Sequence, residues 1–334
     1  MDEILPEQGQ GYKVTKKKDL VPEVVAERPV LVIGAAGMDM VGTIAGSPRH
    51  DGSNPASIRV SFGGVARNVA ENLARLGQPV RLISAVGGDP VGHNLLAHTA
   101  SVGVDVTACL ELNNVATASY LAVIQEDVGP VMALDDMRIL DALTPAYLRQ
   151  KAALFEDAAM VFVDANLRPA ALKAVFALAR RAKVPVCADT TSVSLAARLA
   201  PHLEEIYLLT ANSSEAAVIN PDTPEITGRF TALQAARQLV NRGVEIAIIS
   251  LAHFGVCYAT SSTSGHVPAV RTRVVDPTGA GDALTATVIF GLVNDISIDE
   301  SLRLGVTAAS LILKHPGTVF PGLTLERLYD ELVI

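Results

Sequence analysis

The residues best suited to chemistry form the segment Asp276-Pro277-Thr278-Gly279-Ala280-Gly281-Asp282, which leads directly into an apolar stretch, residues 283–292. The apolar stretch predicts a buried helix, and the small residues before it let backbone N–H groups approach a ligand closely. A helix N-terminus with free N–H groups binds anions. Because a carboxylate there would repel a phosphate, we expect Asp282 to face an incoming hydroxyl and accept its proton while the three small residues stabilise a transferring phosphoryl group. A simple helix cap at Asp282 is the alternative.

A second segment of this kind, Gly63-Gly64-Val65-Ala66-Arg67-Asn68, lies in the N-terminal part of the chain and is followed by apolar residues at helical spacing. Gly63 and Gly64 end an expected strand and permit close backbone approach. Asn68 falls in the first turn of the expected helix, where its amide would meet a ligand hydroxyl, and Gly77 stops that helix. A tight strand-to-helix turn with Asn68 as a local cap is the alternative.

The remaining chain predicts a scaffold that brings these segments together, because short apolar runs alternate with helical patterns. The expected strands are 30–33, 80–86, 160–163, 184–188, 206–209 and 246–250, and the expected helices include 169–182, 192–200, 213–219 and 231–241. This alternation predicts a mainly parallel sheet with helices on both faces. Residues 41–62 and 115–134 break the rhythm, so we expect them to form a small β lid, with a hairpin turn at Gly129-Pro130.

Composition limits the remaining classes of protein. The 334 residues are 49% hydrophobic with a net charge of −8 and no Trp, which disfavours nucleic acid as a partner. Three cysteines without a CxxC pair disfavour a disulfide scaffold or a zinc site and favour the cytoplasm. No apolar stretch is long enough for a signal peptide or a membrane span. We expect residues 1–28 to be a flexible extension and 29–334 to be one domain.

The two segments resemble, in the same order, the paired signatures of the ribokinase-like (PfkB) family of carbohydrate kinases, which are close to G-G-x-x-x-N-x-A-x-x-L-A-x-L-G and D-T-x-G-A-G-D. The segment at 86–92 resembles the family's V-G-x-D-x-x-G, and the likeness extends over nearly the whole chain from about residue 30. It implies a three-layer α/β/α domain of the ribokinase type and an ATP-dependent kinase with Asp282 as the base. Pro277 stands where the family usually has Thr.

The resemblance also implies binding roles for residues outside the two segments. Asp39, after the first strand, would bind sugar hydroxyls. Asn212 and Glu215 match an N-x-x-E element that orders magnesium-bound water near the ATP phosphates, although Asn followed by Glu is also a helix-capping pattern. Ser250 and Gly255 match a turn against the ATP phosphates whose first glycine is missing here, at Ala252-His253.

A monovalent-cation site, usually for potassium, is the last ligand site that the resemblance implies. Asp276 and Thr278 match residues that shape it, and residues 305–318 would complete it and line the adenine pocket. Thr278, Gly279 and Gly281 would also contact ATP. Pro277 removes one N–H and one hydroxyl beside this site.

A likeness to the pseudouridine kinases within the family narrows the choice of the molecule that accepts the phosphoryl group. This likeness rests on residues 53–55, 117–121, 135–139 and 164–166. It implies that Asp136, Met137 and Asn166 contact the nucleobase while the 5′-hydroxyl is phosphorylated, since Asn offers donors and acceptors and Asp offers acceptors. An exposed turn is the alternative for Asp136 and Met137. Ribose, adenosine, other nucleosides and ketohexoses remain alternative acceptors.

Two other classes of function fit the sequence less well. The run from Val30 through Gly37 resembles the opening of a dinucleotide-binding fingerprint, but Met40 replaces its last glycine and Asp39 intrudes. A non-catalytic metabolite-binding paralogue would explain Pro277 and the missing glycine, whereas the intact segment from Gly279 to Asp282 argues against it. We also expect a homodimer formed through the β lid, because pairing protects exposed strand edges.

Overall fold

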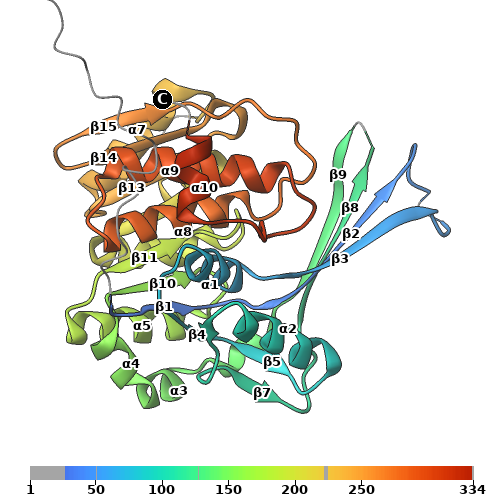
Figure 1. The fold of residues 1–334 in the computed structure, drawn as a ribbon, viewed down its shortest axis with the longest axis horizontal. Coiled ribbons are helices and arrows are strands. Elements are labelled where there is room, and N and C mark those ends of the chain that lie inside the picture. The colour runs from blue at the N-terminus through green and yellow to red at the C-terminus, as the bar shows by residue number, and fades with distance from the viewer. Residues whose placement is uncertain (1–26, 50, 127, 222–224, 333–334) are drawn as a thin grey trace, which may run out of the picture.

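The computed structural model describes residues 27–49, 51–126, 128–221 and 225–332. Its central sheet confirms the mainly parallel α/β fold, with strands in the order β15-β14-β13-β12-β11-β10-β1-β4-β6 (Figure 1). In that order the strands are Ser264–Val267, Val256–Thr260, Ile246–Ser250, Leu208–Asn212, Val186–Asp189, Met160–Asp164, Val30–Ile33, Val80–Ile83 and Val104–Asp105. The seven strands that lie from β13 through β1 to β6 in this order are parallel to one another. β14 and β15 extend the sheet in antiparallel fashion.

Helices cover both faces of the sheet, and β1 shows why its sequence is apolar throughout. Val30 and Val32 pack into the core beneath α1, α8, α9 and α10, whereas Leu31 and Ile33 pack into the core on the opposite face, beneath α3, α4 and α5. A parallel strand buried on both faces has no polar side to present. The helices are α1 Val65–Arg75, α2 Pro90–Ser101, α3 Pro145–Gln150, α4 Ala152–Asp157, α5 Pro169–Ala182, α6 Ser213–Ile219, α7 Arg229–Asn241, α8 Ala280–Val293, α9 Ile298–Leu313 and α10 Leu325–Glu331.

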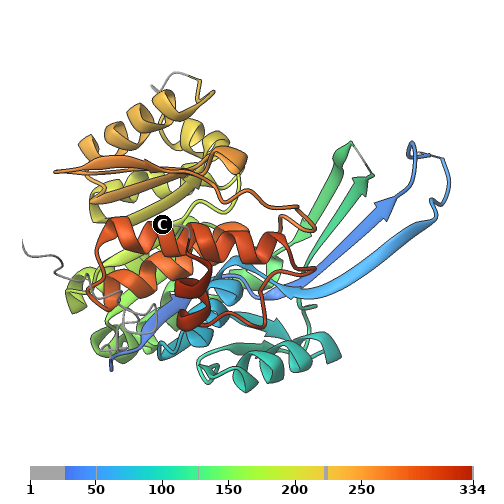
Figure 2. The same cartoon turned by 45° about the horizontal axis from the view of Figure 1, so that its top comes forward.

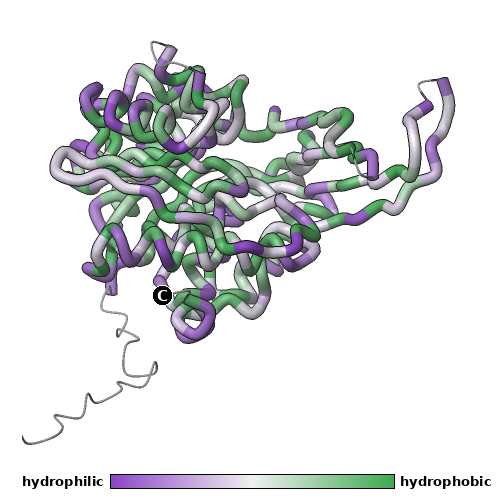
Figure 3. The backbone as a smooth tube through the Cα atoms, turned by 90° about the horizontal axis from the view of Figure 1, so that it is seen from above, coloured by the Kyte–Doolittle hydropathy of each residue, from purple (hydrophilic) through white to green (hydrophobic). Residues whose placement is uncertain are grey.

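The two β-rich segments form a separate four-stranded sheet, which is the expected lid. It contains β2 (Gly37–Ile44), β3 (Ala56–Gly63), β8 (Ala118–Gln125) and β9 (Gly129–Asp136), in the order β3-β2-β8-β9. Each hairpin is antiparallel, and the two hairpins join through the parallel pair of β2 and β8. The lid projects from the body of the molecule (Figures 2 and 3). Its strand β2 begins just after the carboxyl end of β1, and β3 leads directly into α1.

Three local predictions were wrong in detail. Gly129 and Pro130 begin β9 instead of forming the hairpin turn; this is an edge strand, where the missing N–H of proline is tolerated. The strand expected at 80–86 divides at Ser84, whose hydroxyl donates to the Gly34 carbonyl at 2.7 Å; β4 stays in the main sheet and β5 (Ala85–Gly87) pairs with β7 (Leu110–Leu112). The helix expected at 192–200 is a 3₁₀ segment at Ala196–Glu205 that contains Pro201, which cannot donate within an α-helix.

The extension predicted at residues 1–28 lies almost entirely outside the described residues, which begin at Glu27. Within the described part of the chain, no helix is both long enough and apolar enough to cross a bilayer.

Candidate active site

The N-terminus of α8 positions the proposed base. Gly279 caps the helix with φ 82°, a left-handed conformation that glycine adopts without strain, and the Thr318 carbonyl lies where a side chain would project. Ala280 and Gly281 begin the helix, and Asp282 lies in its first turn. Asp282 therefore lies at the N-terminal end of α8, where backbone N–H groups have no partner within the helix.

Asp282 lies in an environment that disfavours its charge. Burial raises the pKa of Asp282 to about 8, the negative charges of Asp189 and Asp39 add to that rise, and Asn68 and Arg67 oppose it. The amide Nδ2 of Asn68 donates to Oδ2 of Asp282 at 2.6 Å. A carboxylate with its pKa near neutrality is well matched to accepting a hydroxyl proton.

A small cavity of about 150 Å³ joins Asp282 to the residues assigned to ATP. Its lining includes Asp189, Thr210, Asn212, Glu215, Ser250, Gly281 and Asp282. The strand ends of β11, β12 and β13 supply most of these residues, so ligand-facing groups gather at the carboxyl edge of the parallel sheet, where α/β proteins bind ligands. Asp189 and Thr210 were not among the predicted site residues.

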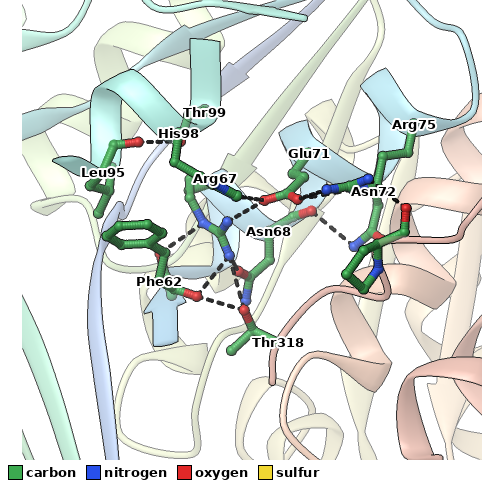
Figure 4. A network of polar contacts seen from close by, with 12 residues as sticks. Phe62, Arg67, Asn68, Glu71, Asn72, Arg75, Leu95, His98, Thr99 and Thr318 are labelled. Carbon is green, nitrogen blue, oxygen red and sulfur yellow. Dashed lines mark hydrogen bonds and ion pairs between the residues drawn. The ribbon is translucent and has the colours of Figure 1, made fainter. Parts of the chain in front are cut away.

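Asn68 is held in one orientation by the buried Arg67 (Figure 4). The guanidinium donates to Asn68 Oδ1, pairs with Glu71, and reaches the Phe62 carbonyl and Thr318 Oγ1, each at 2.9 Å. Because the amide oxygen faces Arg67, its nitrogen must face Asp282. Asn68 thus contacts the proposed base directly, an arrangement that its place in the glycine-rich motif did not reveal.

Asp39 lies on β2 beside the same cluster and is only 8% exposed. A side chain at position 63 would collide with its carboxylate, so Gly63 is needed for this close approach. Burial raises the pKa of Asp39 to about 6, with Arg67 opposing the shift and Asp276 adding to it. Asp39 is therefore mostly ionised at neutral pH and can accept hydrogen bonds from hydroxyls.

Asp164, at the end of β10, organises the backbone beneath the site. Its carboxylate accepts from the N–H groups of Ala35, Ala66 and Asn166 at 2.8, 3.1 and 3.0 Å. These bonds connect the end of β1 and the start of α1 to the loop that carries Asn166. The sequence offered a signal, an acidic residue at the end of a fully apolar strand, but it did not identify the partners.

Asn212 and Glu215 form both halves of a capping box at the start of α6. Glu215 Oε2 accepts from the Asn212 N–H at 2.9 Å and from Thr190 Oγ1 at 2.7 Å, and Oε1 accepts from Asn212 Nδ2 at 2.7 Å. The capping alternative is thus present, while both residues also face the cavity. With its oxygens engaged in this way, Glu215 suits contact with a magnesium ion through water better than direct ligation.

The other residues assigned to ATP lie around this edge of the sheet. Gly255 ends the turn between β13 and β14 with φ 91° and packs against the Val267 carbonyl. Beyond it, between β15 and α9, is a hollow of about 700 Å³ whose lining includes Val306 and Thr307, from the segment expected to line the adenine pocket. Thr278 donates its N–H to Asp276 Oδ1 at 3.0 Å.

The residues assigned to the nucleobase share a third hollow, of about 440 Å³. Asp136, Met137 and Asn166 all line it, together with Asp135, Arg138, Asp141, Arg168, Leu195 and Arg198. Arg138 binds both oxygens of Asp136, at 2.8 and 2.6 Å, and keeps the pKa of Asp136 low, at about 2. Arg198 donates to the carbonyls of residues 165–167 and so fixes the loop that carries Asn166.

Comparison with known proteins gives one consistent family. The profile of pfkB family carbohydrate kinases matches residues 28–324. Pseudouridine kinase from Escherichia coli is 33% identical over 90% of this chain and 95% of its own, and guanosine-inosine kinase from Exiguobacterium acetylicum is 30% identical over 85% and 94%. Ribokinase from Arabidopsis thaliana, solved with ribose and ATP, shares the fold with a TM-score of 0.78 at 22% identity, over 91% of this chain and 98% of its own. This chain therefore belongs to the pfkB family of carbohydrate kinases and is an ATP-dependent kinase.

Proposed function

We propose that this kinase transfers the γ-phosphoryl group of ATP to the 5′-hydroxyl of a nucleoside, and that the nucleoside is pseudouridine. The observation that carries the proposal is the shared hollow of Asp136, Met137 and Asn166, residues picked out by their likeness to pseudouridine kinases. The 33% identity with a pseudouridine kinase supports the same acceptor.

The chemistry follows from the surroundings of Asp282. The acceptor hydroxyl gives its proton to the Asp282 carboxylate as its oxygen bonds to the γ-phosphorus, and the bond from that phosphorus to the ADP oxygen breaks. The N–H groups at the start of α8 face the charge that develops on the phosphoryl oxygens. Asn68 holds the carboxylate in place through its 2.6 Å hydrogen bond.

ATP and Mg²⁺ are the proposed cofactors. ATP supplies the phosphoryl group, and the magnesium ion balances phosphate charge. Asn212, Glu215, Ser250 and Gly255 would line the phosphate side, with Glu215 acting through water. Among the described residues, no group of three or more His, Cys, Asp or Glu is arranged as a metal cage.

Asp136 provides a physical basis for choosing pseudouridine over uridine. Uracil is joined to ribose through carbon in pseudouridine, so its ring keeps an N–H that uridine lacks. Asp136 is ionised at neutral pH, as an ordinary aspartate is, and Arg138 lowers its pKa further, to about 2. A carboxylate only accepts hydrogen bonds. A hydrogen bond from the additional N–H to this carboxylate would favour pseudouridine by about ten- to a hundredfold.

The test is the rate of ATP consumption with pseudouridine, uridine, adenosine, cytidine, guanosine, inosine, ribose and fructose. We expect the highest kcat/KM with pseudouridine. Asp136→Asn should lower kcat/KM for pseudouridine about ten- to a hundredfold while changing that for uridine much less. Asp157→Asn is the matched control, since Asp157 also pairs with an arginine, Arg81, but does not line this hollow, so it should affect the two nucleosides equally.

A preference for another acceptor would refute the proposed substrate and leave the kinase chemistry intact. Guanosine and inosine are the main competitors because of the 30% identity with guanosine-inosine kinase. Binding of a nucleoside without any ATP consumption would instead favour the non-catalytic alternative.

A further inference from the structure

Arg59, on lid strand β3, forms an ion pair with Asp276 in the turn before α8. The two residues come from distant parts of the chain, and the loops flanking α8 and α9 lie beside the base of β3 (Figures 1 and 2). Asp276 is only 2% exposed, so its charge needs partners inside the protein. Arg59 is the cationic partner that the structure shows for it among the described residues.

Two backbone N–H groups also donate to Asp276, so that three of the roughly four lone-pair sites of this carboxylate face donors. Oδ1 accepts from the Thr278 N–H at 3.0 Å, and Oδ2 accepts from the Gly317 N–H at 3.2 Å in addition to Arg59. A monovalent cation needs oxygen lone pairs directed toward it, whereas this carboxylate already receives two N–H groups and a guanidinium. The residues present therefore do not fit the potassium ion that the family resemblance implies at Asp276 and Thr278.

The Arg59 side chain has one nitrogen without a hydrogen-bond partner among the described residues. Its Nε is buried and has no hydrogen-bond acceptor within the described residues. A donor left in this way is unfavourable, so the pairing with Asp276 must account for the position of the side chain. A second link nearby, from Thr318 Oγ1 to the Phe62 carbonyl at 2.6 Å, also holds the end of β3 against the loop after α9.

We propose that Arg59 supplies at Asp276 the positive charge that a monovalent cation would otherwise supply, and that this kinase therefore works without potassium. The effect on catalysis rests on the kinase function proposed above; the effect on stability does not. Because the charge is carried on the lid, the turn that leads to Gly279 and Asp282 is neutralised only when β3 lies against it.

The experiment compares the intact protein with Arg59→Met, Arg59→Lys and Arg49→Met in potassium, sodium or choline chloride at one ionic strength. Arg49 is an exposed arginine in the connection between β2 and β3 and serves as the matched control. Thermal unfolding is recorded without substrates, and turnover is recorded with ATP, magnesium and the best acceptor.

We expect the unaltered protein and Arg49→Met to show equal unfolding temperatures and turnover within about twofold in all three salts, since a guanidinium pair needs no added ion. Arg59→Met leaves a buried carboxylate unpaired, so it should unfold at a lower temperature and turn over at least about tenfold more slowly in choline, with recovery in potassium. Arg59→Lys should remain independent of potassium. Two outcomes would overturn the proposal, and neither requires an acceptor. In the first, potassium alone raises the unfolding temperature of the unaltered protein. In the second, Arg59→Met unfolds like the unaltered protein in every salt.

Discussion

The raised pKa of Asp282 predicts an unusual dependence of turnover on pH. The proposed base must be ionised to accept a proton, yet burial and the charge of Asp189 bring its pKa to about 8. With that pKa, about a tenth of the Asp282 side chains are ionised at pH 7 and about one in a hundred at pH 6. The rate with both substrates held below their KM reports the free enzyme, and it should fall nearly tenfold for each pH unit below 7.

Two neighbours should move this profile in opposite directions. Burial and the charge of Glu215 raise the pKa of Asp189 itself to about 7, so its charge acts on Asp282 mainly above that pH. Asp189→Asn removes this charge, so the upper part of the acidic limb should shift to lower pH. Asn68→Ala removes the hydrogen bond that lowers the pKa of Asp282, so the limb should shift to higher pH. At saturating substrates the limb should also lie at lower pH, because bound magnesium favours the ionised carboxylate. A free-enzyme profile that is flat between pH 6 and 8 would refute the reasoning.

Asp282→Asn completes this test. It should lower turnover at least about a hundredfold, as expected for loss of a general base. The pKa of Asp282 rises from 3.8 to about 8 on folding, so between these values the native state holds a proton that the unfolded state releases. The carboxylate therefore contributes less and less to stability as pH rises through that window, and the amide should unfold at the same or a higher temperature at pH 8. Near-full turnover by this variant would exclude Asp282 as the base.

Two further predictions concern the lid. Asp39→Ala should raise the KM for the acceptor about tenfold or more, because hydrogen bonds to a charged group are lost, and should change the KM for ATP little. An unchanged acceptor KM in steady-state kinetics would remove Asp39 from the site. Ile58 and Leu134 are 71% and 58% exposed on β3 and β9, the two edge strands of the lid, so we expect a homodimer. Light scattering should show that Leu134→Asp dissociates this dimer and that Ser57→Asp, on the other side of β3 from Ile58, leaves it intact. A monomeric wild-type protein would contradict the prediction.

The parts of the fold that depend on local pattern were predictable from the sequence. Apolar runs located the parallel strands because a strand covered on both faces must be apolar throughout. Asp282 could be singled out as a candidate base because the small residues and the helix start that such a site needs are adjacent in the chain. The antiparallel addition of β14 and β15, by contrast, has no distinct periodicity, since antiparallel and parallel strands share the same side-chain alternation.

The parts of the site that depend on contacts between distant residues were not predictable. In the sequence, Arg59 is one polar residue of an alternating strand, and no neighbouring residue indicates that it forms an ion pair with Asp276. Asn68 reads as a ligand contact or a cap, and its orientation follows from a buried arginine and from Thr318 near the other end of the chain. In the sequence Asp189 is only the end of a strand, although in the structure its charge is second to burial among the causes that raise the pKa of Asp282.

These distant contacts connect the lid to the base. The Phe62 carbonyl, at the end of β3, accepts from both Arg67 and Thr318, and Arg67 in turn fixes the amide that donates to Asp282. A displacement of β3 would disturb these acceptors, allow the Asn68 amide to turn, and remove a bond that stabilises the ionised base. The acceptor residue Asp39 lies on the neighbouring strand, so an acceptor that holds the lid in place also holds the base in its active orientation. If Asp39 binds the acceptor as proposed, we expect acceptor binding to steady β2 and β3 and, through Phe62 and Arg67, the Asn68 amide that donates to Asp282.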